Sequence, residues 1–164
     1  MPNGQSQTSQ VSLADERITL IGARNGLELA IKPTSARSIG KVISRPDSPD
    51  LIAGVAIQQL QVHPDDRGFF TEVARLGSAG IASRMIPDGE RSIQVSTTLT
   101  YPGTIKAIHY HFIQTDLWAP ITGMFQVFLY DLRSCSATFG LINTLYVGVL
   151  RPWEILIPPG VAHG

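Results

Sequence analysis

Short hydrophobic runs that alternate with polar residues recur along the chain, and this pattern predicts strands. Turn residues separate the runs, as in Pro64-Asp65-Asp66-Arg67-Gly68 and Tyr101-Pro102-Gly103. Helical periodicity is scarce, and no internal repeat or heptad pattern occurs. Many short strands with regularly spaced turns predict an all-β protein, built as an antiparallel sandwich or barrel. The expected strands are residues 55–62, 69–74, 93–99, 105–112, 123–132, 145–149 and 154–157.

The first fifty residues differ in composition from the rest and predict an N-terminal extension. Residues 1–12 are rich in Gln and Ser and carry too little apolar surface to fold, so we expect them to be disordered. Two apolar runs then flank Asn25-Gly26, a strong signal for a β-hairpin. Prolines, serines and aspartates over residues 33–50 indicate a linker. The chain therefore divides into an extension, residues 1–50, and a β domain, residues 51–164.

Composition and charge exclude several classes of function. Lys and Arg together number 13, as do Asp and Glu, so no net charge attracts nucleic acid or an anionic membrane. The single cysteine, Cys135, excludes an internal disulfide. No stretch reaches the roughly 18 apolar residues of a membrane helix, and the polar first ten residues lack a signal-peptide pattern. We expect a cytoplasmic protein that binds neither nucleic acid nor membranes.

Three of the four histidines lie in two segments that suggest a site. In an extended strand, His109 and His111 point to the same face with their Cα atoms about 6.6 Å apart. Asp116 follows five positions after His111, and a Pro-x-Gly-x-x-His sequence presents His163 on a tight turn. Three imidazoles and a carboxylate in this pattern are able to converge on one ion or one substrate.

These segments resemble the two cupin motifs. Gly103, five residues, His109-x-His111, four residues, Asp116, six residues and Gly123 follow the first motif, with Asp in the usual Glu position. Pro158-x-Gly160-x-x-His163 resembles the core of the second motif.

Within the cupins, the chain resembles the dTDP-4-dehydrorhamnose 3,5-epimerase family over residues 51–164. The resemblance implies an antiparallel cupin jelly roll, a double-stranded β-helix. It rests on motifs that occur in the family's order: Asp66-Arg67-Gly68, Phe69-Phe70-x-Glu72, Gln94-x-Ser96-x-Thr98-x-Thr100, Ile108-His109-Tyr110, Tyr130-Asp131-Leu132-Arg133 and Pro158-Pro159-Gly160-Val161-Ala162-His163-Gly164.

The resemblance implies an isomerase of dTDP-rhamnose biosynthesis and carbohydrate metabolism. Such enzymes move protons at the carbons beside the 4-keto group of a deoxythymidine-diphosphate 4-keto-6-deoxy sugar, as homodimers and without a metal or other cofactor. His109 matches the family's catalytic base, and imidazole suits this role because its ordinary pKa of about 6.5 leaves it mostly neutral at pH 7.

The substrate-binding residues are carried over in the same way. Positions that contact the nucleotide in the family correspond to Arg67, Phe70, Glu72 and Gln94. Guanidinium binds phosphate or a base edge, and carboxylate accepts a hydrogen bond from thymine N–H. The predicted substrate-binding set also includes Lys106, His111 and His163.

Several family residues are replaced within the expected site. Lys106 replaces an Arg, which keeps the charge but loses the planar fork that binds phosphate with two hydrogen bonds. His111 replaces a Gln, and Asp116 replaces a Lys. Ser96 and Val127 replace a common Asn and an acidic residue. The chain is similar in these features to a subgroup with the His-x-His and Asp-Leu-Trp arrangement.

The family continues after Ala-His-Gly with further strands, an acid tyrosine and an aspartate that orients the catalytic histidine. From a sequence that stops at Gly164 we expect a jelly roll that is incomplete at its C-terminal end. Its exposed sheet edges are then completed by a longer natural chain or by a partner.

Two alternative functions remain open at this point. In the first, His109, His111, Asp116 and His163 bind Fe, Mn, Zn or Ni, because imidazole and carboxylate suit these ions. In the second, the protein is a non-catalytic homologue that binds a sugar nucleotide or serves in assembly.

Overall fold

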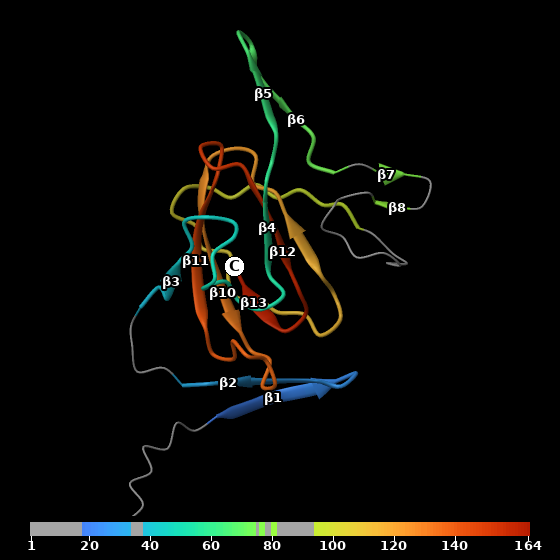
Figure 1. Cartoon of the computed structure of the whole chain (residues 1–164), viewed down its shortest axis with the longest axis vertical. Helices are drawn as coiled ribbons and strands as arrows, with labels where there is room; N and C mark the ends of the chain where they lie inside the picture. The colour runs from blue at the N-terminus through green and yellow to red at the C-terminus, as the bar shows by residue number, and fades with distance from the viewer. Residues whose placement is uncertain (1–17, 34–37, 75, 78–79, 82–93) are drawn as a thin grey trace, which may run out of the picture.

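The computed structural model describes residues 18–33, 38–74, 76–77, 80–81 and 94–164, and all of its regular elements are strands (Figure 1). The expectation of disorder for residues 1–12 lies outside these ranges. Within them, no helix is long and apolar enough to cross a membrane. The strands are β1 Thr19–Arg24, β2 Leu27–Ile31, β3 Lys41–Val42, β4 Ala56–Gln59, β5 Val62–Asp65, β6 Gly68–Thr71, β7 Leu76–Gly77, β8 Gly80–Ile81, β9 Asp116–Trp118, β10 Met124–Asp131, β11 Ile142–Gly148, β12 Trp153–Ile157 and β13 Val161–His163.

Two sheets form the body of the domain (Figure 1). One has the strand order β13-β10-β11-β3, and the other has the order β4-β12-β9. The pairings among the described strands are antiparallel, with the exception of the short parallel pair of β11 and β3. The prediction of an all-β antiparallel architecture is therefore confirmed, apart from this one edge strand.

The core lies between the two sheets because alternate residues of each central strand point inward. On β10 these are Val127 and Leu129, and on β12 they are Ile155 and Ile157. All four are almost fully buried. The other buried members of this cluster are Ile43, Ile52, Val55, Leu145, Val147, Trp153 and Val161.

The predicted hairpin around Asn25-Gly26 is confirmed as β1 and β2. Both turn residues have positive φ, 50° at Asn25 and 80° at Gly26, as a two-residue hairpin turn requires. Leu29 on β2 is fully buried against Leu132 and Ala162 in a second apolar cluster. This cluster attaches the hairpin to the domain.

Not every predicted strand forms. Residues 94–100 and most of residues 105–112 belong to no strand, although their sequence favours one. Strand propensity alone does not supply a hydrogen-bonded neighbour, and side chains such as Val95 and Ile105 are exposed here. The sequence pattern also missed β9 and β13, which have three residues each and are defined by their pairing partners.

Asp131, at the end of β10, is the centre of a buried polar network. Its side chain is inaccessible to solvent and accepts hydrogen bonds from Arg133 Nε at 2.8 Å, from Ser136 Oγ at 2.6 Å and from Thr138 Oγ1 at 2.6 Å. Burial alone raises the pKa of Asp131, but these three donors outweigh it and hold the pKa below its ordinary value. The carboxylate therefore connects β10 to the loop that leads into β11.

Substitution of this carboxylate is expected to cost much of the domain's stability. In Asp131→Asn the charge is lost and the Arg133 guanidinium remains, so the free energy of unfolding should fall by about 3–5 kcal/mol in urea titrations at pH 7. Because the pKa is lowered by folding, the stability difference should shrink as the pH falls below the ordinary value of 3.8.

The hairpin β5–β6 offers a matched control. Asp65 has the same Asp-x-Arg spacing, with Arg67 Nη2 at 2.6 Å from its Oδ2, but this pair is solvated. Asp65→Asn should leave the free energy of unfolding unchanged within error. Equal losses in the two variants would contradict the role assigned to the Asp131 network.

Glu154 is a carboxyl group in β12 whose burial is not fully offset by hydrogen bonds. It is 2% exposed, and its Oε1 has no hydrogen-bond partner among the residues that the structure describes. Burial raises the pKa of Glu154 above its ordinary value of 4.5. Ionisation of Glu154 at neutral pH therefore opposes folding.

We expect Glu154→Gln to stabilise the protein by about 1 kcal/mol at pH 7, since the neutral amide avoids the cost of a buried charge. The raised pKa makes this cost appear as the pH rises above 4.5, so variant and wild type should be equally stable below that pH. Thermal unfolding at pH 4 and at pH 7 measures both values. A gain that is the same at both pH values would show that charge is not the cause.

Candidate functional site

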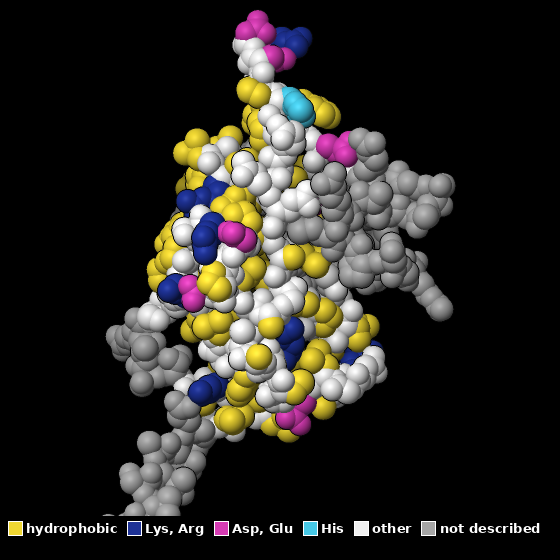
Figure 2. Space-filling model, in the orientation of Figure 1, with side chains coloured by type: hydrophobic (Ala, Val, Ile, Leu, Met, Phe, Trp, Pro, Cys, Tyr) yellow, Lys and Arg dark blue, Asp and Glu magenta, His cyan; other side chains and the backbone are white. Residues whose placement is uncertain are grey.

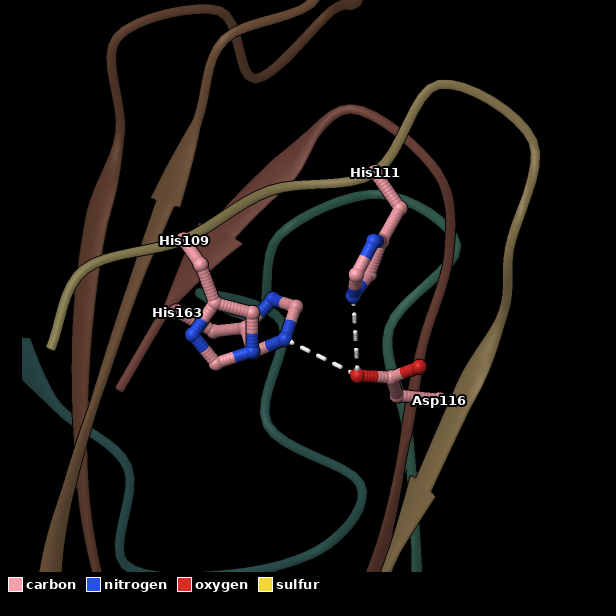
Figure 3. Close-up of side chains that lie close together, drawn as sticks. All are labelled: His109, His111, Asp116 and His163. Atoms are coloured by element: carbon pink, nitrogen blue, oxygen red, sulfur yellow. Dashed lines mark hydrogen bonds and ion pairs between the residues drawn. The ribbon is translucent and has the colours of Figure 1, made fainter. Parts of the chain in front are cut away.

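Four side chains from three separate segments converge on one point (Figure 3). His109 and His111 come from the irregular segment before β9, Asp116 begins β9, and His163 ends β13. One potential ligand atom from each residue lies within 4.8 Å of the corresponding atoms of the others. The structure thus brings together the three imidazoles and the carboxylate that the sequence pattern suggested.

Backbone hydrogen bonds hold His109 against His163. The amide of His109 donates to the carbonyl of His163 at 3.0 Å, and the amide of His163 donates to the carbonyl of His109 at 2.9 Å. His163 also lies opposite Leu129 on β10. This single bridge places the His109 ring 4.3 Å from the His163 ring, measured between centroids.

The alternation expected of an extended segment is present although residues 105–112 form no ladder beyond this bridge. The rings of His109 and His111 lie on the same side, with centroids 5.5 Å apart. The extended backbone around one paired residue is therefore sufficient to direct both rings to the site.

Asp116 is the carboxylate shared by the cluster. Its Oδ2 lies 3.1 Å from His163 Nε2 and 3.5 Å from His111 Nε2. Its other oxygen accepts a hydrogen bond from Gln114 Nε2 at 2.6 Å. Asp116 pairs with Ile157 of β12, and because paired residues share a face of the sheet, its side chain points to the inner face.

Exposure falls across the cluster from His109 to His163. His109 is exposed, His111 and Asp116 are half-buried, and His163 is 1% exposed. Partial burial lowers the pKa of His109, and the neighbouring His163 and His111 lower it further, against an opposing effect of Asp116. His109 is therefore a neutral, accessible imidazole at pH 7 that is able to accept a proton.

Trp118 is a wall of the site that sequence analysis did not select. Its ring centroid lies 5.1 Å from that of His163 and 6.2 Å from that of His109. The period of two in β9 was the available signal, because Asp116 and Trp118 share one face of the strand.

Two of the predicted nucleotide-binding residues lie on a hairpin that projects from the body of the domain. Arg67 and Phe70 belong to the hairpin β5–β6, and their exposed fractions are 83% for the Arg67 side chain and 66% for Phe70. Figure 2 shows charged side chains at the tip of this hairpin, with hydrophobic side chains just below them. Glu72 follows directly after β6 and is also exposed.

Gln94 and Lys106 lie on the exposed segment that precedes the histidines. Gln94 Nε2 donates to Ser96 Oγ at 3.0 Å. Lys106 Nζ donates to Thr98 Oγ1 at 2.8 Å and to the carbonyl of Leu99. Within the described ranges, these hydrogen bonds connect both side chains to their own segment and not to the cluster of His109, His111, Asp116 and His163.

The turn before β13 holds the cluster to the rest of the domain through Gly160. Its amide donates to the carbonyl of His111 at 2.8 Å, and its carbonyl accepts from the amide of Leu132 at 3.0 Å. Its φ is +80°, and an added Cβ would lie 2.5 Å from Arg133 Cγ and 2.9 Å from Leu29 Cδ2. The turn therefore requires glycine for both conformation and space.

Known proteins share most of this domain. The profile of the dTDP-4-dehydrorhamnose 3,5-epimerase family matches residues 50–164. The spore coat polysaccharide biosynthesis protein SpsL of Bacillus subtilis (strain 168) is 45% identical over 118 residues, which cover 70% of this chain and 70% of SpsL. The probable low-salt glycan biosynthesis epimerase Agl13 of Haloferax volcanii is 33% identical over 114 residues, 69% of each chain.

Solved structures share the architecture. A dTDP sugar isomerase from Desulfovibrio desulfuricans G20 superimposes with a TM-score of 0.54 at 25% identity, over 68% of this chain and 67% of that one. A dTDP-4-dehydrorhamnose 3,5-epimerase from Sulfolobus tokodaii gives a TM-score of 0.50 at 26% identity, over 68% and 62% of the two chains. These likenesses confirm the predicted cupin jelly-roll class.

Gly160→Ala should destabilise the protein far more than Gly26→Ala. Both glycines have φ of +80°, but no atom lies within 4 Å of a Cβ added at Gly26. Gly26→Ala should cost only the left-handed backbone conformation, about 1–2 kcal/mol, whereas overlap with Arg133 and Leu29 should bring Gly160→Ala to about 2–5 kcal/mol. Urea titration of the two variants makes the comparison, and equal losses would show that the turn has room for a side chain.

Proposed function

Because this chain belongs to the dTDP-4-dehydrorhamnose 3,5-epimerase family, we propose that it is a nucleotide-sugar epimerase with His109 as the catalytic base. The observation that carries the proposal is the position of His109, an accessible and neutral imidazole at the open side of a buried polar cluster. The family match extends over the segments that hold His109 and His163.

The proposed reaction is proton abstraction beside a ketone. His109 takes the proton from a carbon adjacent to the 4-keto group, and the electron pair of the C–H bond moves to the carbonyl oxygen to give an enolate. Delivery of a proton from water to the opposite face of that carbon inverts the centre, and His109 releases its proton to water. A positioned general base typically contributes about 10²–10⁴ to the rate of such a step.

The surroundings of His109 suit a base that must hold one orientation. Its ring lies against His163 and Trp118, and His163 is itself held by the carbonyl of Val161 and by Asp116. We assign Lys106, His111 and His163 to substrate binding. The N–H donors of Lys106 and His111 stabilise the enolate oxygen or the phosphates, and His163 supports the ring of His109. This preorganisation supports catalysis in preference to binding alone.

The nucleotide end of the substrate is assigned to Arg67, Phe70, Glu72 and Gln94. The hairpin β5–β6 extends away from the histidine cluster of its own chain (Figure 1). It also exposes Phe69 and Phe70, and an isolated two-stranded hairpin is only marginally stable in water. We therefore propose a homodimer in which the hairpin of one chain contributes to nucleotide binding at the partner's cluster.

The family match and the named relatives support the proposed substrate class. SpsL is named for spore coat polysaccharide biosynthesis, and Agl13 is named as a probable epimerase of glycan biosynthesis. We propose a dTDP-linked 4-keto-6-deoxy sugar as the substrate and the supply of a deoxysugar for glycan assembly as the role, with the reaction in the cytoplasm.

Exchange of sugar protons in heavy water tests the proposed base. With a dTDP-4-keto-6-deoxy sugar and a chelator present, NMR should show deuterium entering the carbon beside the ketone. His109→Asn should lower this rate by about 100-fold or more, because the amide is not basic.

Binding of dTDP, measured by calorimetry, separates loss of the base from loss of folding, and His109→Asn should keep the wild-type affinity. If the wild-type protein binds dTDP but exchanges no proton, the chain is a non-catalytic sugar-nucleotide-binding homologue and the epimerase proposal is wrong.

A further inference from the structure

We propose that His109, His111, Asp116 and His163 form a binding site for one divalent transition-metal ion such as Zn²⁺, Co²⁺, Ni²⁺, Fe²⁺ or Mn²⁺. This goes beyond the proposed epimerase activity, which uses no metal, and it stands on the geometry of the cluster.

The first argument is convergence. The four potential ligand atoms lie within 4.8 Å of one another (Figure 3). Metal–nitrogen and metal–oxygen bonds to these ions are about 2.0–2.2 Å long, so ligands on opposite sides of one ion are about 4 Å apart. Small side-chain movements are enough to place all four atoms around one ion. Three imidazoles and a carboxylate are the donors that these ions prefer over Mg²⁺ or Ca²⁺.

The second argument concerns the two nitrogens of His163. Its Nδ1 lies 2.9 Å from the carbonyl oxygen of Val161, and because a carbonyl only accepts, this nitrogen carries the proton. In the neutral ring Nε2 then has a lone pair, and it faces Asp116 Oδ2, another acceptor, at 3.1 Å. Two acceptors at this distance require a cation between them, either a proton or a metal ion.

A metal ion supplies this charge for more than one pair. His111 Nε2 lies 3.5 Å from the same Asp116 oxygen, so a proton on one ring would serve only one of the two contacts. A metal-bound histidine commonly donates its other N–H to a backbone carbonyl, as His163 does to Val161. Gln114 holds Asp116 through the other oxygen, which leaves Oδ2 directed at the rings.

The third argument is the charge at the site. Asp116 places a carboxylate among the three imidazoles, and a carboxylate attracts a cation. The surroundings of His109 therefore suit a cation.

A bound metal and base catalysis exclude each other at His109. A ring nitrogen that gives its lone pair to a metal does not accept a proton. The metal-loaded protein is therefore expected to lose proton exchange, and a chelator should restore it. The exposed position of His109 gives an ion access to the otherwise half-buried cluster.

Titration with Co²⁺ tests the site directly, without substrate. Chelator-treated protein should bind one equivalent of Co²⁺, with the visible absorption of a nitrogen- and oxygen-ligated ion and with the metal content confirmed by mass spectrometry. His111→Gln, which removes one imidazole ligand, should weaken binding by about 100-fold or more. His63→Ala is the matched control, because this histidine lies on the hairpin β5–β6 outside the cluster, and its Co²⁺ binding should equal that of wild type.

Absence of stoichiometric Co²⁺ binding, or equal binding by wild type and His111→Gln, overturns the proposal. Unchanged proton exchange in the Co²⁺-loaded protein also overturns it, because His109 would then not be a ligand. Failure of the epimerase proposal looks different: the chelator-treated protein shows no exchange while Co²⁺ binding follows the pattern above.

Discussion

The buried carboxylate of Asp131 is the interaction on which the rest of the structure depends. It holds Arg133, whose side chain fills the space beside Gly160, and it closes the loop between β10 and β11. Gly160 in turn binds the backbone of Leu132 on one side and that of His111 on the other. A desolvated charge with several donors is tolerated only in one geometry, so the network defines where β13 and its histidine lie.

The arrangement of the site depends on this network around Asp131. His163 is fixed by β13 and pairs with the backbone of His109, and Asp116 reaches both His163 and His111 from β9. One carboxylate oxygen facing two imidazole nitrogens needs a proton or a metal ion between them. The same atoms thus support two proposals, a base that acts on a sugar nucleotide and a ligand set for a transition metal. His109 acts as a base only when no metal ion is bound to its ring nitrogen.

Residue patterns predicted the interior of the fold better than its edges. The alternation in residues 123–132 and 154–157 located the central strands β10 and β12 to within a residue or two. Residues 94–100 have strand-like composition but no strand neighbour, while β9 and β13 are three residues long and exist through pairing. Burial of alternate side chains produces a hydrophobic pattern in the sequence, whereas the presence of a partner strand produces no such pattern.

The amino-acid sequence alone specified the all-β class, the hairpin turn at Asn25-Gly26 and the family, because periodicity, turn chemistry and ordered motifs are local properties of the chain. It also selected His109, His111, Asp116 and His163 as the candidates for the site. Only the tertiary structure decided that Asp116 is shared between two rings, that Trp118 lines the site and that the hairpin with Arg67 and Phe70 projects away from it. These relations join residues up to 47 positions apart, as in the contact of Asp116 with His163, and they arise from sheet register and burial, which no short stretch of sequence encodes.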